Sequence, residues 1–248
     1  MFKAVRVVAK QQMPNYRKPS SFLIKETYPL PPYSSVVGLV HNMCGWAHYH
    51  PLRVSIQGCS ASCVSDYAIN YAFGGIPLDR AQLIVNDENG KQKGIARMLR
   101  SHELLTDVEL LIHIIPDDQE EISEICSALL DPPVYPSLGR YEDLLQIESV
   151  DIVEIGLAED MVTLSYDAYI PIDRISSYAN QNLTGTIYRL GKVFEYESAK
   201  GRSDRASKKS SRVWKESILA RHVSSSIVIN ASDNIYYDKR HNEAILPA

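Results

Sequence analysis

No stretch of this 248-residue chain approaches the run of about 20 apolar residues that a helix needs to cross a bilayer. The first residues, Met1 to Val8, alternate apolar side chains with Lys3 and Arg6 and lack the cleavage pattern of a secretory signal. We therefore expect this segment to form a strand. We also expect a cytoplasmic protein that does not bind membranes.

Cysteine is scarce, with four residues in the whole chain. Cys59 and Cys63 have no second close pair, whereas structural zinc sites usually combine two such pairs. The chain also has no Walker phosphate loop, no G-x-S-x-G elbow and no dinucleotide-binding glycine motif. We expect neither a metal nor an organic cofactor. One further group of candidate ligands also lacks a standard zinc spacing: His41, Cys44, His48 and His50.

Neither sign of charge dominates, because 26 basic and 30 acidic residues give a net charge of −4. The charges are nevertheless segregated. Residues 1–27 hold six basic residues and one acidic residue, and residues 200–215 hold seven basic residues and one acidic residue. Residues 101–160 hold sixteen acidic residues and one basic residue, Arg140. RNA responds to the local field of a patch, so this distribution is compatible with nucleic-acid binding. The acidic middle is expected to face solvent, with docking to a basic partner subunit as the alternative.

Hydrophobic periodicity divides the first part of the chain into alternating strands and helices. Residues 64–102 interrupt this pattern, and the turn signal Asn86-Asp87-Glu88-Asn89-Gly90 predicts an extended hairpin inserted between two core strands. The expected order is β-α-β-hairpin-β-α-β, which is a ferredoxin-like core of the α+β class. The expected core elements are a strand at 2–10, a helix at 35–47, strands at 52–57 and 108–115, a helix from 117 to 130, and a strand pair at 144–155.

The last third of the chain is expected to form a small β-rich extension that packs on the core. Residues 198–212 are rich in Ser, Lys and Arg and predict a flexible basic loop. The predicted division is therefore a ferredoxin-like domain at 1–158, which carries the hairpin, and an extension at 159–248. The strands of the extension are predicted at 166–171, 185–190, 213–220 and 224–230.

The segment Tyr28–Leu39 carries the strongest signal for a binding site. Its three prolines hold the backbone extended and prevent a helix from starting earlier. Ser34 or Ser35 is then expected to cap a helix, whose free N–H groups and positive dipole end attract anions. The plainer alternative is a proline-rich loop followed by an ordinary capped helix. Nearby cations and aromatic rings are expected to help bind phosphate and bases: Arg17, Lys18, Lys25, Tyr28 and Tyr33.

Three segments, in the same order, resemble sequences of one protein family. They are Arg17-Lys18-Pro19 with Lys25 to Gly38, Glu103-Leu104-Leu105-Thr106-Asp107-Val108-Glu109, and Ser137-Leu138-Gly139-Arg140-Tyr141-Glu142-Asp143-Leu144. The first is similar to the N-terminal signature of the fifth family of CRISPR-associated proteins, and the last is similar to that family's leucine-glycine-arginine segment. Members of the family are subunits of Cascade, the type I interference complex. The dipeptide His41-Asn42 after the first segment is most similar to the type I-B branch.

The resemblance implies an RNA-recognition-like (RAMP) core and a thumb-like hairpin that packs against the guide RNA near its 5′ end. The loop at 198–212 has the composition of a phosphate-gripping segment, with a solubilising surface loop as the alternative. The expected RNA contacts of the core and hairpin are His41, Asn42, Lys91, Lys93, Arg97, Arg100 and Arg140. Those of the loop are Lys200, Arg202, Arg205, Lys208 and Lys209.

The expected function is that of a non-catalytic RNA-binding subunit that grips the repeat-derived 5′ handle of the guide RNA (crRNA) and caps the foot of Cascade. The resemblance implies as neighbours the backbone subunit of the seventh family and the large subunit, with target DNA reached through the complex. One alternative is a metal-independent endoribonuclease that processes precursor guide RNA, with Tyr33, His41 and Lys18 as its catalytic set. The type I-C-like branch that cleaves such RNA has a neighbouring lysine and histidine, but here Ser101 precedes His102. A scaffold without a direct RNA role is a third hypothesis.

Overall fold

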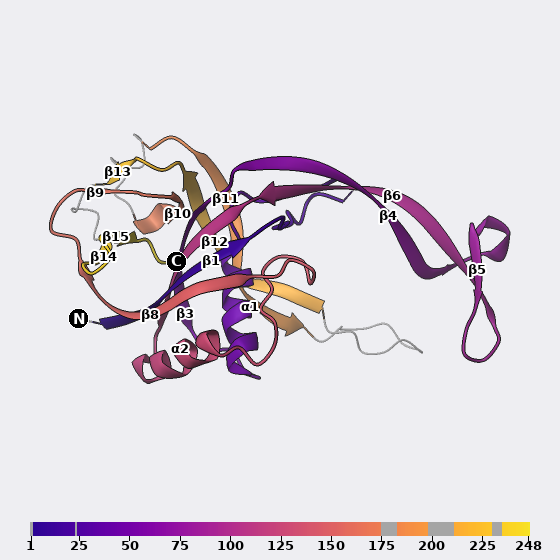
Figure 1. Cartoon of the computed structure of the whole chain (residues 1–248), viewed down its shortest axis with the longest axis horizontal. Helices are drawn as coiled ribbons and strands as arrows, with labels where there is room; N and C mark the ends of the chain where they lie inside the picture. The colour runs from indigo at the N-terminus through magenta and orange to yellow at the C-terminus, as the bar shows by residue number, and fades with distance from the viewer. Residues whose placement is uncertain (1, 23, 175–182, 198–210, 230–234) are drawn as a thin grey trace.

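A computed structural model describes residues 2–22, 24–174, 183–197, 211–229 and 235–248. Its main body is a large β-sheet with two α-helices, and a long hairpin projects away from this body (Figure 1). The protein is therefore of the α+β class, as the sequence predicts. Within the described ranges, no helix is both long enough and apolar enough to cross a bilayer.

Four antiparallel strands form the centre of a nine-stranded sheet, in the spatial order β3-β7-β1-β8. The most buried of them is β7, because six of its nine residues are aliphatic and it lies between β1 and β3. All four strands follow the prediction closely, except that the strand pair expected at 144–155 is one long strand. The strands are β1 (Phe2–Gln11), β3 (Leu52–Cys59), β7 (Val108–Pro116) and β8 (Gln146–Leu157).

Both α-helices pack on one face of this sheet. They are α1 (Tyr33–Cys44) and α2 (Ile122–Leu130), and their apolar residues at helical spacing join the main core cluster. Gly45 ends α1 in the left-handed conformation with φ of 68°, so the helix is shorter than the predicted 35–47. A 3-10 turn at Gln119–Glu121 precedes α2, and the Asp118 carboxylate accepts a hydrogen bond from the N–H of Glu120 there.

The C-terminal residues cover the opposite face of the sheet. After β14 (Tyr236–Asp238) and β15 (Glu243–Ile245), the chain crosses the core strands to reach β3. The Gln57 amide donates to the carbonyl of Ala244 at 2.6 Å, and Ala248 exchanges two backbone hydrogen bonds with Val54 at 3.1 and 3.3 Å. The core sheet is thus closed on both faces.

The rest of the C-terminal part extends the same sheet beyond β3, through β10 (Asp167–Pro171), β12 (Ser211–Val223) and β11 (Thr186–Glu197). These strands match the predictions at 166–171, 213–220 and 185–190. The strand predicted at 224–230 is wrong at its start, because Ser226 has a φ of 67° and forms a turn. The short strand β13 (Val228–Ile229) follows this turn, and it pairs with β9 (Val162–Thr163). The domain boundary near residue 158 stays a prediction.

The projecting hairpin is built from β4 (Ser62–Ile76) and β6 (Gln92–Thr106), so it is longer than the predicted 64–102. Near its tip, β5 (Leu83–Asn86) adds to the outer edge of β6. At its base, β2 (Ile24–Lys25) pairs with β6 in parallel. The predicted turn is present: the Asp87 carboxylate accepts hydrogen bonds from the N–H groups of Asn89 and Lys91, and Gly90 has a φ of 74°.

Candidate nucleic-acid interface

Cations from three separate segments meet at the base of the hairpin. The pairing of β2 with β6 sets Lys25 beside His102, two residues from Arg100. The pKa of Lys25 is lowered by partial burial and by the positive charges of Arg100, Arg17 and Arg140. All four cations are predicted RNA contacts, and the structure brings the three arginines close enough to Lys25 to repel its charge.

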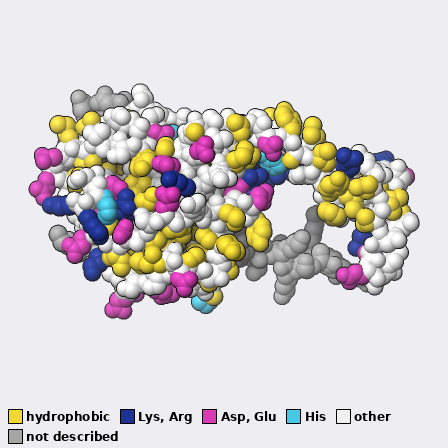
Figure 2. All heavy atoms as spheres, viewed as in Figure 1, with side chains coloured by type: hydrophobic (Ala, Val, Ile, Leu, Met, Phe, Trp, Pro, Cys, Tyr) yellow, Lys and Arg dark blue, Asp and Glu magenta, His cyan; other side chains and the backbone are white. Residues whose placement is uncertain are grey.

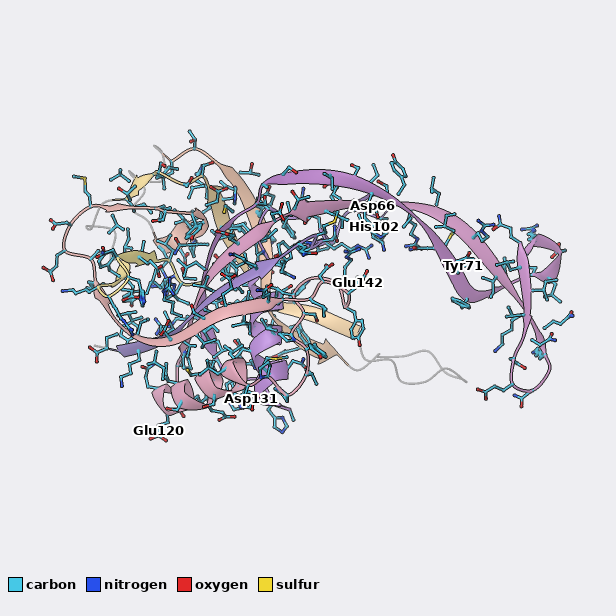
Figure 3. All side chains as sticks on the ribbon, viewed as in Figure 1. Asp66, Tyr71, His102, Glu120, Asp131 and Glu142 are labelled. Atoms are coloured by element: carbon cyan, nitrogen blue, oxygen red, sulfur yellow. The ribbon has the colours of Figure 1, made fainter. Side chains whose placement is uncertain are left out.

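Carboxylates balance only part of this charge. Asp66 lies across the hairpin from His102, and Glu142 lies on the neighbouring loop (Figure 3). Arg140 forms ion pairs with Glu142 at 3.3 Å and with Asp143 at 2.6 Å. By contrast, among the described residues no carboxylate forms an ion pair with the other three cations of the cluster, Arg17, Lys25 and Arg100. A polyanion such as RNA would relieve their mutual repulsion.

The leucine-glycine-arginine motif forms a tight turn whose residue types follow from its geometry. Asp143 is buried and accepts hydrogen bonds from the backbone N–H groups of Asn15 at 3.0 Å and Arg140 at 2.7 Å. The guanidinium of Arg140 binds the same carboxylate. Gly139 has a φ of 111°, and a Cβ there would lie 2.8 Å from an Asp143 side-chain oxygen. Arg140 therefore holds the turn together as well as contributing charge to the cluster.

The start of α1 lines a cavity instead of forming the predicted serine cap. Pro32 occupies the N-cap position and no side chain caps the helix, so the prediction for Ser34 and Ser35 as capping residues is wrong. The helix begins with the buried Tyr33 directly after Pro32, which places both serines inside the first turn. They line a cavity of about 390 Å³ together with Asn42.

Two aromatic residues of this cavity, Phe194 and Trp214, were missed by the sequence analysis. They are paired across β11 and β12, and both side chains are partly exposed. The one sequence signal that could have identified them is that they flank the basic segment 198–212. Exposed aromatic side chains beside cations are typical of surfaces that bind single-stranded nucleic acid.

The family model described as CRISPR-associated protein (Cas_Cas5) matches residues 9–222. The chain belongs to this family. Among solved structures it is similar to a chain of a CRISPR RNA-guided surveillance complex, with 18% identity, 91% of each chain covered and a TM-score of 0.54. A CRISPR protein from Archaeoglobus fulgidus has 11% identity, 98% of each chain covered and a TM-score of 0.46. No curated protein matches. The Cas5 assignment agrees with the resemblance of the three sequence segments, and the type I-B branch stays a prediction.

The two tyrosines of the Cas5-like segment are core residues, which corrects their predicted role in stacking on bases. Tyr33 is 0% exposed and Tyr28 is 9% exposed. Tyr28 packs edge-on against Tyr188, with ring centroids 5.3 Å apart, and Tyr33 packs against Tyr169. Burial raises the pKa of both phenols. Their rings stabilise the contact between the proline-rich segment and the extended sheet, so they are not free to stack on a base.

His41 and Lys18 are also engaged within the protein. The Nδ1 atom of His41 lies 2.8 Å from the carbonyl of Val37, and its Nε2 accepts a hydrogen bond from the N–H of His50 at 3.0 Å. Burial lowers the pKa of His41. Lys18 forms an ion pair with Glu26 at 3.2 Å. Tyr33, the third member of the alternative catalytic set, is buried. The structure therefore does not present Tyr33, His41 and Lys18 together on an exposed surface.

The remaining predicted cations lie away from the hairpin base. Lys93 is seven residues from Arg100 on β6, which is about 23 Å in an extended strand. It forms an ion pair with Asp87 at 3.2 Å. Arg97 faces Tyr71, which lies halfway along the hairpin in Figure 3, and Lys91 follows the turn at the tip. Hydrophobic and basic side chains both gather on the visible face of the hairpin (Figure 2). The five predicted loop cations lie outside the described residues: Lys200, Arg202, Arg205, Lys208 and Lys209.

Proposed function

We propose that this Cas5-family chain is a non-catalytic subunit of a type I CRISPR interference complex and binds the 5′ handle of the guide RNA. In this proposal it caps the complex beside the large subunit and contacts the backbone subunit of the seventh family. Target DNA is then reached through the assembled complex. A solved structure with the same fold is described as a CRISPR RNA-guided surveillance complex, which supports an assembly of this kind.

The arrangement of the core strands supports a ferredoxin-like RNA-binding domain. The element order β1-α1-β3-β7-α2-β8 and the spatial order β3-β7-β1-β8 have the connectivity of that fold. The hairpin leaves this core between β3 and β7, where the thumb is expected. We therefore propose that the hairpin acts as the thumb that packs on the guide RNA.

The observation that carries the proposal is the convergence of unpaired cations at the hairpin base. Lys25 and Arg100 come from segments far apart in the sequence, and β2 serves to hold them together. Within the described part of the chain neither forms an ion pair. A cluster that is unfavourable by itself and favourable with phosphate is expected of an RNA-binding surface.

We propose a non-catalytic role because Tyr33, His41 and Lys18 are not arranged to cleave RNA. A general base must reach the proton that it removes, and an electrophilic cation must reach the phosphate. The Tyr33 hydroxyl is buried, both ring nitrogens of His41 are occupied, and Lys18 is bound to Glu26. Labelled repeat RNA incubated with the protein in EDTA is expected to remain uncut. A discrete cut within the repeat would support the endoribonuclease instead.

The proposal is tested by the binding of labelled repeat RNA to the chain co-expressed with its partner subunits. The double variant Lys25→Gln with Arg100→Gln is expected to bind more weakly. Its log affinity should also fall less steeply with log salt concentration, with a slope smaller in magnitude by about 0.7 for each lost phosphate contact. The control is Lys239→Gln, which removes an exposed cation on the turn after β14 that pairs with Glu159. Equal binding by the double variant and the control would contradict the proposal.

A further inference from the structure

The cavity at the start of α1 has one polar wall and one aromatic wall. Ser34, Ser35 and Asn42 of α1 form the polar wall. Phe194 and Trp214 form the aromatic wall, with ring centroids 6.4 Å apart and planes at 87°. The cavity volume of about 390 Å³ lies within the range of about 300–1,000 Å³ that is usual for sites of small organic groups.

Trp214 is supported as a flat platform. A Cβ atom at Gly191 would lie 2.6 Å from the ring carbons of Trp214, so the glycine allows the backbone of β11 to lie directly against the indole. The side chain of Trp214 nevertheless remains 51% exposed. A rigid ring with one side supported and half of its surface exposed is suited to stacking on a nucleobase.

The polar wall offers hydrogen-bonding groups without partners. Among the described residues, none accepts from or donates to the side chains of Ser34, Ser35 and Asn42. The amide of Asn42 supplies both donors and an acceptor, as an edge of a nucleobase requires. Gly38 lies between these residues on α1, and a Cβ there would meet no atom within 4 Å. The missing side chain at Gly38 keeps the cavity open.

The cavity adjoins the cation cluster through a single turn. Gly139 lines the cavity, and the next residue, Arg140, belongs to the cluster at the hairpin base. A strand of RNA whose phosphates lie on that cluster can therefore place one base in the cavity. Bases of single-stranded RNA are recognised in this way, by stacking on an aromatic ring and by hydrogen bonds to their edges.

We infer that this cavity binds one unstacked base of the guide RNA, with Trp214 stacking on the base and Asn42 hydrogen-bonding its edge. The inference rests on the proposed function, since it concerns the same RNA. It adds a position at which the protein distinguishes the handle sequence. The plainer alternative is that Trp214 only packs on Gly191 and shields the backbone of β11 from solvent.

The test combines base removal with substitution of Trp214 in the co-expressed complex. Handle RNAs that each lack one base are compared with the intact RNA, for the wild type and for Trp214→Ala and Trp214→Phe. In the wild type, loss of one particular base should weaken binding about tenfold. In Trp214→Ala the same loss should have almost no further effect, and Trp214→Phe should behave like the wild type.

The outcomes separate this inference from the proposed function. If each missing base costs the same affinity in Trp214→Ala as in the wild type, the cavity does not bind a base, although the RNA-binding function stands. If the wild-type complex does not bind handle RNA at all, the proposed function itself is wrong and the inference fails with it.

A second variant tests the cavity without removing any side chain. Gly38→Leu should fill the cavity, and the fold should remain intact because the position is open and leucine favours a helix over glycine. We expect an unchanged or higher melting temperature and RNA binding about tenfold weaker. Ser123→Leu, on the exposed side of α2, is the matched control. Unchanged RNA binding by Gly38→Leu would overturn the inference.

Discussion

Glu243 lies in a network of charged side chains between the core sheet and the C-terminal residues. The guanidinium of Arg6 donates to both of its carboxylate oxygens, at 2.6 and 2.7 Å. The Nε2 atom of the fully buried His113 lies 3.5 Å from one of these oxygens. Burial alone would raise the pKa of Glu243, but Arg6 and His113 lower it to about 2. Glu243 is therefore a carboxylate over nearly the whole pH range.

This lowered pKa predicts how stability depends on pH. Because the folded pKa lies below the ordinary value of 4.5, the carboxylate contributes fully to stability above pH 4.5, and the contribution is lost as the pH falls towards 2. Glu243→Gln leaves Arg6 without its partner and should lower the free energy of unfolding at neutral pH by about 3 kcal/mol. Urea unfolding should also show that the variant loses less stability than the wild type between about pH 5 and pH 3.

A matched control separates this effect from the general loss of a carboxylate. Glu109 forms an exposed ion pair with Lys10 at 3.5 Å. Glu109→Gln should change the free energy of unfolding by less than about 1 kcal/mol, because exposed pairs contribute little. If the two variants have the same stability and the same pH dependence, the network around Glu243 does not stabilise the fold as described.

At the scale of elements, segments with their own hydrophobic pattern were predicted well. The aliphatic run of β7 needs no distant information to form a buried strand. The start of α1 was misplaced because serine is statistically the better cap, whereas the helix begins directly after Pro32 with Tyr33 buried in the core. The short strand β14 depends on pairing with distant β8, and β15 pairs with β14, so neither carries a local signal.

In the candidate site, too, features that depend on distant segments were not predicted. Arg17 and Lys25 were predicted as cations near the proline-rich segment, and Arg100 was assigned by the resemblance to the family. Their meeting depends on the two-residue strand β2, which no local pattern marks. The platform of Trp214 depends on Gly191 of the neighbouring strand, and this contact is set by a register shift between β11 and β12. The sequence therefore predicts candidate binding residues, but it does not predict how the fold brings them together.

The hairpin divides into a base that belongs to the site and a tip that packs mainly on itself. Among the strands that the structure describes, the tip strand β5 pairs with β6 alone. Tyr71 faces Arg97 across the hairpin, so residues 72–96 can be replaced by an Asn-Gly turn without changing the register. We expect the melting temperature to change by less than about 3 °C. Because Lys25 and Arg100 remain, the shortened protein should keep most of its affinity for repeat RNA.

The double variant Lys25→Gln with Arg100→Gln provides the comparison for this deletion. It should lose more affinity than the shortened hairpin, although it changes only two side chains. A shortened protein that binds as weakly as the double variant would move the main contact from the base of the hairpin to its tip.

At the scale of the whole molecule, the C-terminal residues close one face of the core sheet. RNA-recognition folds commonly stack bases on the sheet face that their helices leave open. Here that face is covered by residues 243–248, which bond to Gln57, Ser55 and Val54 of β3. Among the described residues, the proposed RNA surface therefore lies at the hairpin base, the leucine-glycine-arginine turn and the start of α1. The acidic residues of 101–160 do not argue against RNA binding at this proposed surface, because the four cations of the candidate site lie together at the hairpin base.

If the C-terminal residues are part of the core, their removal must unfold the protein and not merely uncover a binding face. Deleting residues 243–248 removes Glu243, the partner of Arg6. It also removes the buried side chains of Ile245 and Leu246, which are 0% and 3% exposed, and so exposes the core residues that they cover. Loss of one buried aliphatic side chain costs about 2–5 kcal/mol, and a typical domain has only about 5–15 kcal/mol of stability. We therefore expect the deletion variant to lack a cooperative urea transition, whereas Lys239→Ala in the nearby exposed turn keeps the wild-type midpoint. A deletion variant that unfolds cooperatively and binds RNA more tightly would show instead that these residues are a removable cover over a second RNA surface.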